Sequence, residues 1–224
     1  MPIIYLLRHA QSSANTRGIL AGQDNSVELS KKGVKEAKEI VGYLESLKIT
    51  QIYCSPLTRC LQTITPYMTR NPNTAFVVEP RLIEMDYGKW SGRKLTGLTR
   101  DPRWKQVLTK PSTFTFPEGE GFKKMRSRVD QLLADLAVEK GSLLLVTHGD
   151  IIKMILASTL SLPIDRFQSF VAEPASISTI RIDKGSQTVL QTNYRIKSSN
   201  FQLFKSNQLG GGNLVGEQKI WWKR

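Results

Sequence analysis

The sequence predicts an α/β protein built on a mostly parallel central sheet. Two continuous apolar runs, residues 3–7 and 142–147, are typical of strands buried on both faces, as the strands of parallel sheets are. A helical pattern begins at Asp150 after the second run and completes a strand, turn and helix unit. With 224 residues and 40% apolar content, the chain can bury one substantial core. We therefore expect one globular domain, residues 1–196.

The elements between the two runs follow from local signals. A polar loop, residues 11–25, is too poor in periodic apolar residues to be a core element, and we expect it to cover a functional site. Ser30 is the predicted N-cap of an amphipathic helix. The packing face of that helix is the apolar series Val34, Ala37, Ile40, Val41, Leu44 and Leu47. Gln51–Cys54 is the next predicted strand, and Ser55 followed by Pro56 predicts the N-cap and first position of another helix.

The second half of the chain is assigned in the same way. Its first elements are a short strand, a loop held down by two large aromatic residues, a short helix and an irregular stretch, at residues 75–78, 81–92, 101–108 and 111–121. A long amphipathic helix follows, with one face formed by Phe122, Met125, Val129, Leu132, Leu133 and Leu136. Two closing strands are expected at residues 176–183 and 188–192.

Residues 197–224 differ in composition from the rest of the chain. They include three consecutive glycines, end in two tryptophans and two cations, and carry five cations against Glu217. Polar tails rich in glycine are more often mobile, so we expect a flexible C-terminal tail. The paired tryptophans leave a docked arm as the alternative.

The formal net charge of +13 would suit an anionic partner. Because the lysines and arginines are spread along predicted helices and loops, we do not expect nucleic acid. A basic enzyme that acts on phosphorylated substrates would carry the same charge without it. No run approaches the roughly 20 apolar residues of a membrane span, and the N-terminus lacks the layout of a signal peptide. We expect a cytoplasmic protein without a membrane partner, with Cys54 and Cys60 as reduced thiols. A homodimer remains open.

Two histidines carry the first functional signal. His9 and His148 are the only histidines in the chain, and each lies just beyond the carboxyl end of a predicted buried strand. Ligands of open α/β sheets bind at that edge. Either histidine alone would be interpreted as structural, but their shared placement favours function. A catalytic zinc site needs about three protein ligands, and the chain lacks the usual His and Cys spacings, so we expect no metal and no cofactor.

Arg59 is placed in the first turn of the predicted helix that follows Ser55. A cation there opposes the helix dipole, at a cost of about 0.3 to 1 kcal/mol when exposed. Either a surface arginine tolerates this cost, or an anion held between its guanidinium and the helix amides reverses it. The sequence alone leaves both interpretations open.

Four segments contain these residues: Leu-Arg-His at 7–9, SPLTRCLQT at 55–63, LIEMDYG at 82–88 and VTHGD at 146–150. Together they resemble the four landmark motifs of the histidine phosphatase superfamily, also called the phosphoglycerate mutase-like family. The match covers about residues 2–195 in the right order and spacing. Segments 20–22, 86–92 and 148–153 are similar to a bacterial subgroup labelled probable phosphomutases. The resemblance implies a three-layer sandwich of the phosphoglycerate mutase-like type.

The resemblance also implies the site residues. Those implied to be catalytic are His9, Glu84, Arg8, Arg59 and His148. Those implied to bind substrate are Asn15, Arg8, Arg59, His148 and Gly149. In this scheme His9 attacks phosphorus to form a phosphohistidine, and both arginines and His148 surround the phosphoryl oxygens. Glu84 protonates the leaving oxygen and later takes a proton from water.

Three positions depart from the family pattern. Ala10 follows the nucleophile where glycine is usual, which the loop accepts if the backbone φ is not positive. Met85 and Leu95 stand where true phosphoglycerate mutases are expected to have an arginine and a lysine that grip the substrate.

Because those cations are missing, the first interpretation is a metal-independent phosphatase that hydrolyses a small phosphorylated metabolite through a phosphohistidine. A phosphoglycerate mutase-like phosphomutase and a non-catalytic module that binds a phosphorylated ligand are the alternatives. The substrate itself does not follow from the sequence.

Overall fold

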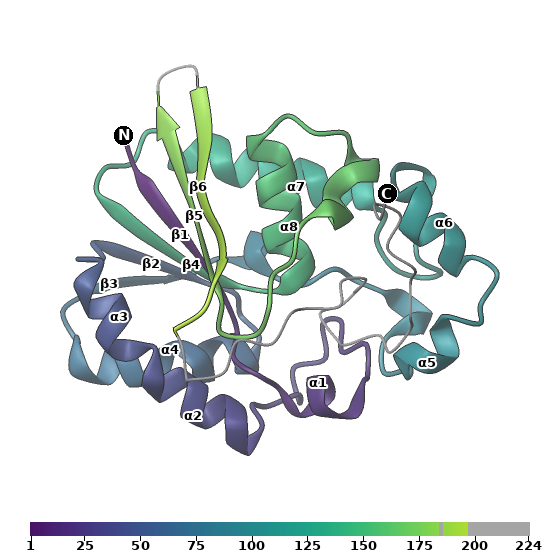
Figure 1. The fold of residues 1–224 in the computed structure, drawn as a ribbon, viewed down its shortest axis with the longest axis horizontal. Coiled ribbons are helices and arrows are strands. Elements are labelled where there is room, and N and C mark those ends of the chain that lie inside the picture. Colours follow the sequence, from purple (N-terminus) through teal and green to yellow (C-terminus); the bar gives the residue numbers. More distant parts are fainter. Residues whose placement is uncertain (184–185, 197–224) are drawn as a thin grey trace, which may run out of the picture.

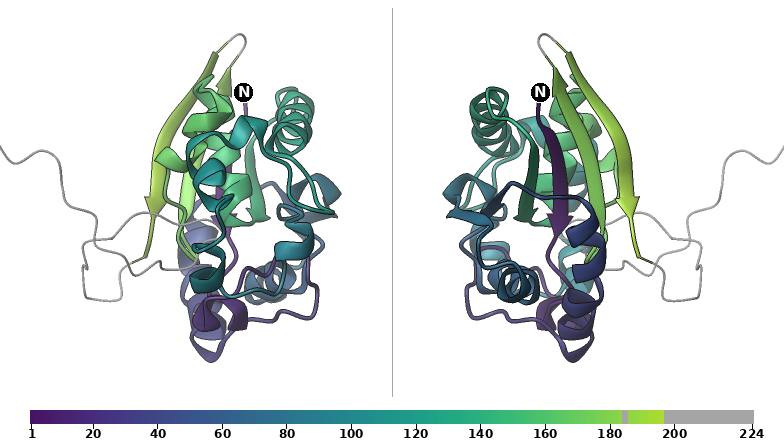
Figure 2. Two further views of the ribbon diagram at one scale, coloured as in Figure 1. Left: turned by 90° about the vertical axis from the view of Figure 1, so that its right-hand side faces the viewer. Right: turned by 90° about the vertical axis from the view of Figure 1, so that its left-hand side faces the viewer.

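A six-stranded sheet lies between two layers of helices in the computed structural model of the protein, which describes residues 1–183 and 186–196 (Figures 1 and 2). The strand order is β3-β2-β4-β1-β5-β6. The strands are β1 Ile3–Arg8, β2 Gln51–Cys54, β3 Ala75–Val78, β4 Ser142–Thr147, β5 Ile177–Asp183 and β6 Ser186–Tyr194. The first four run parallel, and β5 and β6 each pair antiparallel with the preceding strand in this order. The predicted α/β class with a mostly parallel sheet is therefore confirmed.

The helices surround the sheet and fill the segments between its strands. The α-helices are α1 Ser13–Arg17, α2 Lys31–Glu39, α3 Val41–Ser46, α4 Thr58–Arg70, α5 Leu95–Leu98, α6 Trp104–Thr109, α7 Phe122–Leu136 and α8 Gly149–Thr159. Shorter 3-10 helices are η1 Pro80–Leu82, η2 Gly88–Trp90, η3 Pro111–Thr113 and η4 Ile164–Ser169. No helix in the described ranges is both long enough and apolar enough to cross a bilayer.

The continuous apolar runs of β1 and β4 are explained by burial on both faces. Ile4 and Leu6 belong to a core cluster with α7 and α8, whereas Leu7 belongs to a second cluster with α2, α3 and α4. In β4, Leu143 and Leu145 face the first cluster, and Leu144 and Val146 face the second. Successive side chains of a strand point to opposite faces, so both faces require apolar residues.

The register of β1 and β4 places their carboxyl ends together. The strands pair in parallel from Ile3 opposite Ser142 to Arg8 opposite Thr147. The residues that follow the two strands therefore emerge side by side at one edge of the sheet.

The prediction of which residues form the packing face of the helix after Ser30 is partly wrong. Ser30 caps α2 as expected, with its side chain accepting a hydrogen bond from the amide of Gly33. Val34, however, is 46% exposed, and the buried residues of α2 are Gly33, Glu36 and Ala37. The reason is a close backbone contact, because a Cβ at Gly33 would lie 2.0 Å from the carbonyl oxygen of Gln11. The glycine thus turns the helix face toward the loop after β1.

The polar loop at residues 11–25 also contains more structure than the sequence predicts. It includes α1, and Ala14 and Leu20 are fully buried. A capping box starts α1, in which Ser12 and Asn15 bond each other's backbone amides. The predicted tail at residues 197–224 lies outside the described residues, so its boundary stays a prediction.

Candidate active site

His9 and His148 lie next to each other at the carboxyl edge of the sheet. Their ring centroids are 5.3 Å apart, and the backbone amide of His9 donates to the carbonyl of Thr147 over 2.9 Å. Both side chains are buried. The parallel pairing of β1 and β4 thus brings the two histidines together, as their placement after these strands predicted.

The hydrogen bond of His9 fixes its tautomer. Its Nδ1 lies 2.8 Å from the carbonyl oxygen of Ala10, which can only accept, so Nδ1 carries the proton. Nε2 therefore keeps its lone pair. Burial lowers the pKa of His9 well below its usual value, and the charges of Arg59 and Arg8 lower the pKa further. The ring is neutral and nucleophilic near neutral pH.

Ala10 fits the loop behind His9. It is absent from the described non-glycine residues that have a positive φ. Its amide donates to Oγ1 of Thr63 over 2.9 Å, and the same hydroxyl donates to the carbonyl of Arg59 over 2.7 Å. One side chain of α4 therefore connects the backbone after His9 with the backbone of Arg59.

Arg59 is buried, which excludes the surface interpretation. Only 1% of the residue is exposed, and its Nη2 and Nη1 donate to the carbonyls of Gly22 and Asp24 over 2.7 and 3.1 Å. Those two carbonyls belong to the loop that covers the site. The guanidinium is held next to this loop, in the first turn of α4.

Arg8 is also 1% exposed. Its Nη1 donates to the carbonyl of Ala172 over 2.7 Å. A Cβ at Gly149 would lie 3.4 Å from Cζ of Arg8, so Gly149 begins α8 directly against the guanidinium. Arg8 and Gly149 are thus packed together in the cluster.

Ser55 has a different role from the predicted helix cap. Leu57 is the N-cap of α4, with extended backbone angles of φ −75° and ψ 136°, so the helix begins at Thr58. The hydroxyl of Ser55 instead lies 2.8 Å from Nε2 of His148. Sulfur Sγ of Cys60 is 3.5 Å from the same nitrogen. Burial lowers the pKa of His148 well below its usual value, and Arg59 lowers it further.

Glu84 is buried too, so it is not a solvated loop carboxylate. It is 5% exposed, and its Oε1 accepts a hydrogen bond from the amide of Met85 over 2.9 Å. Burial, followed by the charge of Asp150, raises the pKa of Glu84 to about 7. A carboxyl with this pKa can donate and accept a proton near neutral pH.

Arg128 of α7 holds the loop that carries Glu84. Its Nη1 donates to the carbonyls of Arg81 and Ile83 over 2.7 and 2.8 Å, and its Nη2 donates to the carbonyl of Glu84 over 3.3 Å. A salt bridge of 2.7 Å to Glu120 fixes the same guanidinium. No pattern in the sequence indicates this support, because the acceptors are backbone groups that any residues would supply.

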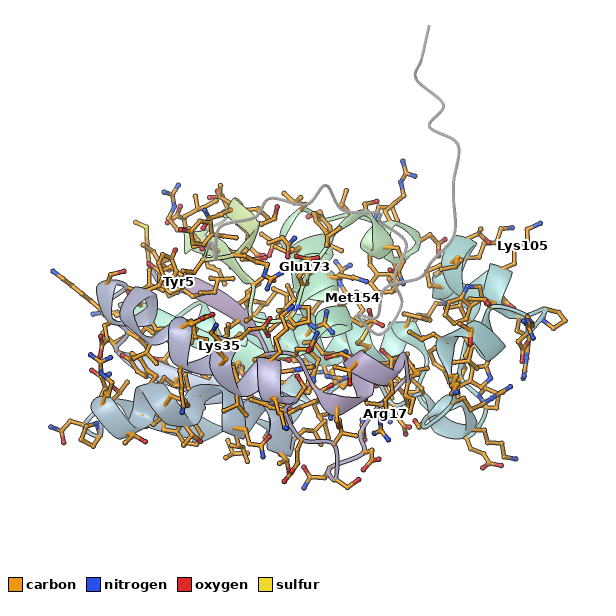
Figure 3. All side chains as sticks on the ribbon, turned by 60° about the horizontal axis from the view of Figure 1, so that its bottom comes forward. Tyr5, Arg17, Lys35, Lys105, Met154 and Glu173 are labelled. Atoms are coloured by element: carbon orange, nitrogen blue, oxygen red, sulfur yellow. The ribbon has the colours of Figure 1, made fainter. Side chains whose placement is uncertain are left out.

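A pocket with about 260 Å³ of empty space, including its open mouth, gives access to the cluster. It is lined by His9, Ser12, Asn15, Ile19, Leu20, Ala21, Gly22, Arg59, Glu84 and Tyr87. The loop predicted to cover the site therefore supplies six of these residues. Figure 3 turns the lower end of the Figure 1 view forward, and its labelled Arg17 lies at the end of α1, within the same loop.

Each residue predicted for the site now has a position. His9, Glu84, Arg59 and Asn15 line the pocket, Arg8 packs against Gly149, and His148 lies against His9. Residues 1–183 and 186–196 contain no cluster of three or more His, Cys, Asp and Glu side chains that could hold a metal ion. Some further side chains support the site without having been predicted to do so. Ser55 was predicted only as a helix cap, Tyr87, Asp150 and Lys153 only belonged to motif segments, and Arg128 belonged to none.

A comparison of the sequence with models of protein families shows to which family the chain belongs. Residues 4–195 match the model of the histidine phosphatase superfamily, branch 1. The chain belongs to this superfamily. It is therefore an enzyme of a group that includes phosphatases and phosphomutases.

Among the individual relatives, some are named phosphatases and others phosphoglycerate mutases. A probable phosphatase of Schizosaccharomyces pombe is 30% identical over 156 residues, which are 68% of this chain and 70% of the relative. The probable phosphoglycerate mutase GpmB of an Enterobacter species is 31% identical over 164 residues, 71% of this chain and 75% of the relative. The crystal structure of the alpha-ribazole phosphatase of Shigella flexneri superposes with a TM-score of 0.77 at 22% identity, over 88% of this chain and 100% of the other. This structural likeness confirms the predicted phosphoglycerate mutase-like fold.

Proposed function

We propose that the protein is a metal-independent phosphatase that hydrolyses a small phosphorylated metabolite through a phosphohistidine. One observation carries the proposal: a neutral histidine, a buried arginine and a carboxyl of raised pKa, His9, Arg59 and Glu84, line one pocket. A second histidine, His148, lies against His9, and the buried Arg8 packs against Gly149 directly after it. Each of these groups has a task in phosphoryl transfer, and the chain supplies all of them. The buried positive charges stabilise a phosphoryl group whose charge is spread over three oxygens.

In the first step, Nε2 of His9 attacks phosphorus. The N–P bond forms while the P–O bond to the leaving group breaks, and Glu84 gives its proton to the leaving oxygen. Arg8, Arg59 and His148 hold the phosphoryl oxygens, and Asn15 and Gly149 complete the substrate-binding set. The bond from Nδ1 of His9 to the carbonyl of Ala10 orients the ring and stabilises its developing positive charge.

In the second step, water attacks the phosphohistidine. Glu84, now a carboxylate, takes a proton from the water as the new P–O bond forms and the N–P bond breaks. Inorganic phosphate leaves, and both His9 and Glu84 return to their starting protonation states. A pKa of about 7 suits Glu84 for both directions of proton transfer.

The packing of two side chains favours a phosphatase over a phosphomutase. Met85 and Leu95 stand where the family pattern of mutases has cations, and both belong to the apolar core, where they are 0% and 3% exposed. Neither position can present a charge to a second anionic group of the substrate. A mutase needs such charges to retain the substrate while the phosphoryl group is returned to it.

The experiment is a panel of phosphomonoesters that includes p-nitrophenyl phosphate and 3-phosphoglycerate, assayed with and without EDTA. We expect free phosphate as the product, activity that EDTA does not change, and loss of both turnover and acid-labile phosphate uptake in His9→Ala. Glu84→Gln should slow turnover strongly at saturating substrate. Glu139→Gln, which changes an exposed carboxyl, is its matched control and should leave turnover unchanged. Formation of 2-phosphoglycerate instead of free phosphate would establish the mutase. A purified protein that neither hydrolyses any ester nor takes up phosphate would be a binding module.

A further inference from the structure

A buried ion pair lies behind the pocket, on the first turn of α8. Asp150 and Lys153 are 0% and 4% exposed in their side chains, and Oδ1 of Asp150 is 3.4 Å from Nζ of Lys153. The partners of Lys153 include Oε1 of Gln168, at 3.1 Å. None of the steps proposed above assigns a task to this pair.

Asp150 is bonded to the wall of the pocket as well. The hydroxyl of Tyr87 donates to Oδ2 of Asp150 over 2.8 Å, and Tyr87 lines the pocket together with Glu84. The ring of Tyr87 packs edge-on against Phe116, with centroids 5.1 Å apart. Asp150 thus fixes the free end of a side chain that follows Glu84 by three residues on the same loop.

Such a pair is costly in an apolar helix. Apart from this pair, all residues from Gly149 to Leu156 are apolar and buried. The free energy needed to remove two charges from water is often larger than the free energy gained from their attraction. An apolar pair of similar volume would fold at least as well. A role in the chemistry explains why charges are placed here.

We propose that Asp150 and Lys153 are positioning residues for the reaction: Lys153 holds Asp150, and Asp150 holds the hydroxyl of Tyr87 in the pocket wall that Tyr87 shares with Glu84. The inference rests on the proposed function, in which Glu84 is the proton donor.

The charges that shift the pKa of Glu84 come from three elements, and Arg128 of a fourth, α7, faces the backbone carbonyl of the same residue. Asp150 of α8 raises the pKa of Glu84, whereas Arg59 of α4 and Arg8 of β1 lower it. Burial lowers the pKa of Lys153, and the charge of Glu84 acts in the opposite direction, so these two groups also interact. Removing the negative charge of Asp150 should therefore lower the pKa of Glu84, and removing the positive charge of Lys153 should raise it.

The test measures kcat against pH for Asp150→Asn, Lys153→Met and the wild type. Phenyl phosphate, whose leaving group needs a proton, is compared with p-nitrophenyl phosphate, whose leaving group needs none. For phenyl phosphate, we expect Asp150→Asn to move the alkaline limb about one pH unit lower and to reduce kcat at pH 7 about fivefold. Lys153→Met should move the same limb higher. Turnover of p-nitrophenyl phosphate should change much less in both variants.

Two further variants distinguish an effect of the charges on the reaction from simple unfolding of Asp150→Asn or Lys153→Met. Asp150→Asn combined with Lys153→Met removes both charges of the pair, and its limb should lie between those of Asp150→Asn and the wild type. Tyr87→Phe removes the hydrogen bond but keeps both charges, so it should raise KM while leaving the limb in place. Asp130→Asn is the matched control, because it breaks a helical ion pair with Arg126 in which only the Asp130 side chain is exposed.

The inference is overturned if Asp150→Asn and Lys153→Met move the limb in the same direction, or if the double variant keeps the wild-type limb. Glu84→Gln separates the hypothesis that Glu84 is the proton donor from the hypothesis that Asp150 and Lys153 are its positioning residues. If it turns over phenyl phosphate at the wild-type rate, the role proposed for Glu84 fails and this inference fails with it. If Glu84→Gln is inactive while the limbs of the other variants do not move, only the inference about the pair fails.

Discussion

Ionisation of Glu84 should make the folded protein less stable as the pH rises. The pKa of its carboxyl is raised from the ordinary value of 4.5 to about 7 in the folded protein. Each pKa unit corresponds to about 1.4 kcal/mol, so ionising Glu84 costs about 3 kcal/mol more in the folded protein than in the unfolded chain. The folded state binds the proton of Glu84 more tightly than the unfolded chain does, so this proton stabilises the fold. Its contribution to the free energy of unfolding is fully present below pH 4.5 and is lost as the pH rises toward 7.

Glu84→Gln removes the ionisation while its side-chain oxygen can still accept the hydrogen bond from the Met85 amide. We expect the variant and the wild type to have similar free energies of unfolding at pH 4.5. At pH 8 the variant should be more stable by up to about 3 kcal/mol. Urea unfolding at both pH values measures this difference, and other titrating groups cancel in the comparison.

Glu139→Gln serves as the control, since Glu139 is exposed and its substitution should leave both free energies unchanged. The reasoning is refuted if Glu84→Gln gains no stability between pH 4.5 and pH 8. A loss of stability at high pH relative to the wild type would mean that the Glu84 carboxylate is favoured in the fold.

Three further predictions concern the residues around the site. Trp90→Ala should lower the free energy of unfolding in urea by about 3 to 5 kcal/mol, because the ring is 1% exposed and stacks within an aromatic cluster; a loss below 1 kcal/mol would contradict this. Gly88→Ala should destabilise the protein far more than Gly92→Ala. Both glycines have a positive φ, but only at Gly88 would the new Cβ meet another atom, the carbonyl oxygen of Pro117 at 2.1 Å. Equal shifts of the melting temperature in the two variants would refute this contact. Ser55→Ala should lower kcat about tenfold by leaving the His148 ring nitrogen without the hydroxyl, and an unchanged kcat would show that this bond does not support the reaction.

The central strands and the meeting of the two histidines were predictable from the sequence. A strand buried on both faces must be apolar at every position, so β1 and β4 are visible as uninterrupted runs. Polar residues just after such runs must emerge at one edge of a parallel sheet. That is why His9 and His148 could be paired although they lie 139 positions apart in the chain.

The supports of the site were not predictable, because they depend on contacts between distant segments. Arg128 holds the loop of Glu84 through backbone carbonyls, which carry no signal in the sequence. The bond from Ser55 to His148 depended on where α4 begins, and a proline after a serine indicated a cap instead.

Two other features left a trace that could have been used. Asp150 and Lys153 are charged residues in an otherwise apolar helical segment, and such positions rarely serve packing alone. Gly33, inside a helix of charged residues, indicated a close backbone approach, which explains why Val34 faces solvent.

The hydroxyl of Thr63 has a consequence for how a phosphorylated ligand binds. It accepts from the amide of Ala10 and donates to the carbonyl of Arg59, so the nucleophile's loop and the start of α4 are joined before any ligand arrives. The entropy of ordering these groups is then lost during folding, and binding a phosphate-like anion such as vanadate does not incur it again. The site is preorganised, and Thr63→Val should turn part of this folding cost into a weaker affinity for vanadate.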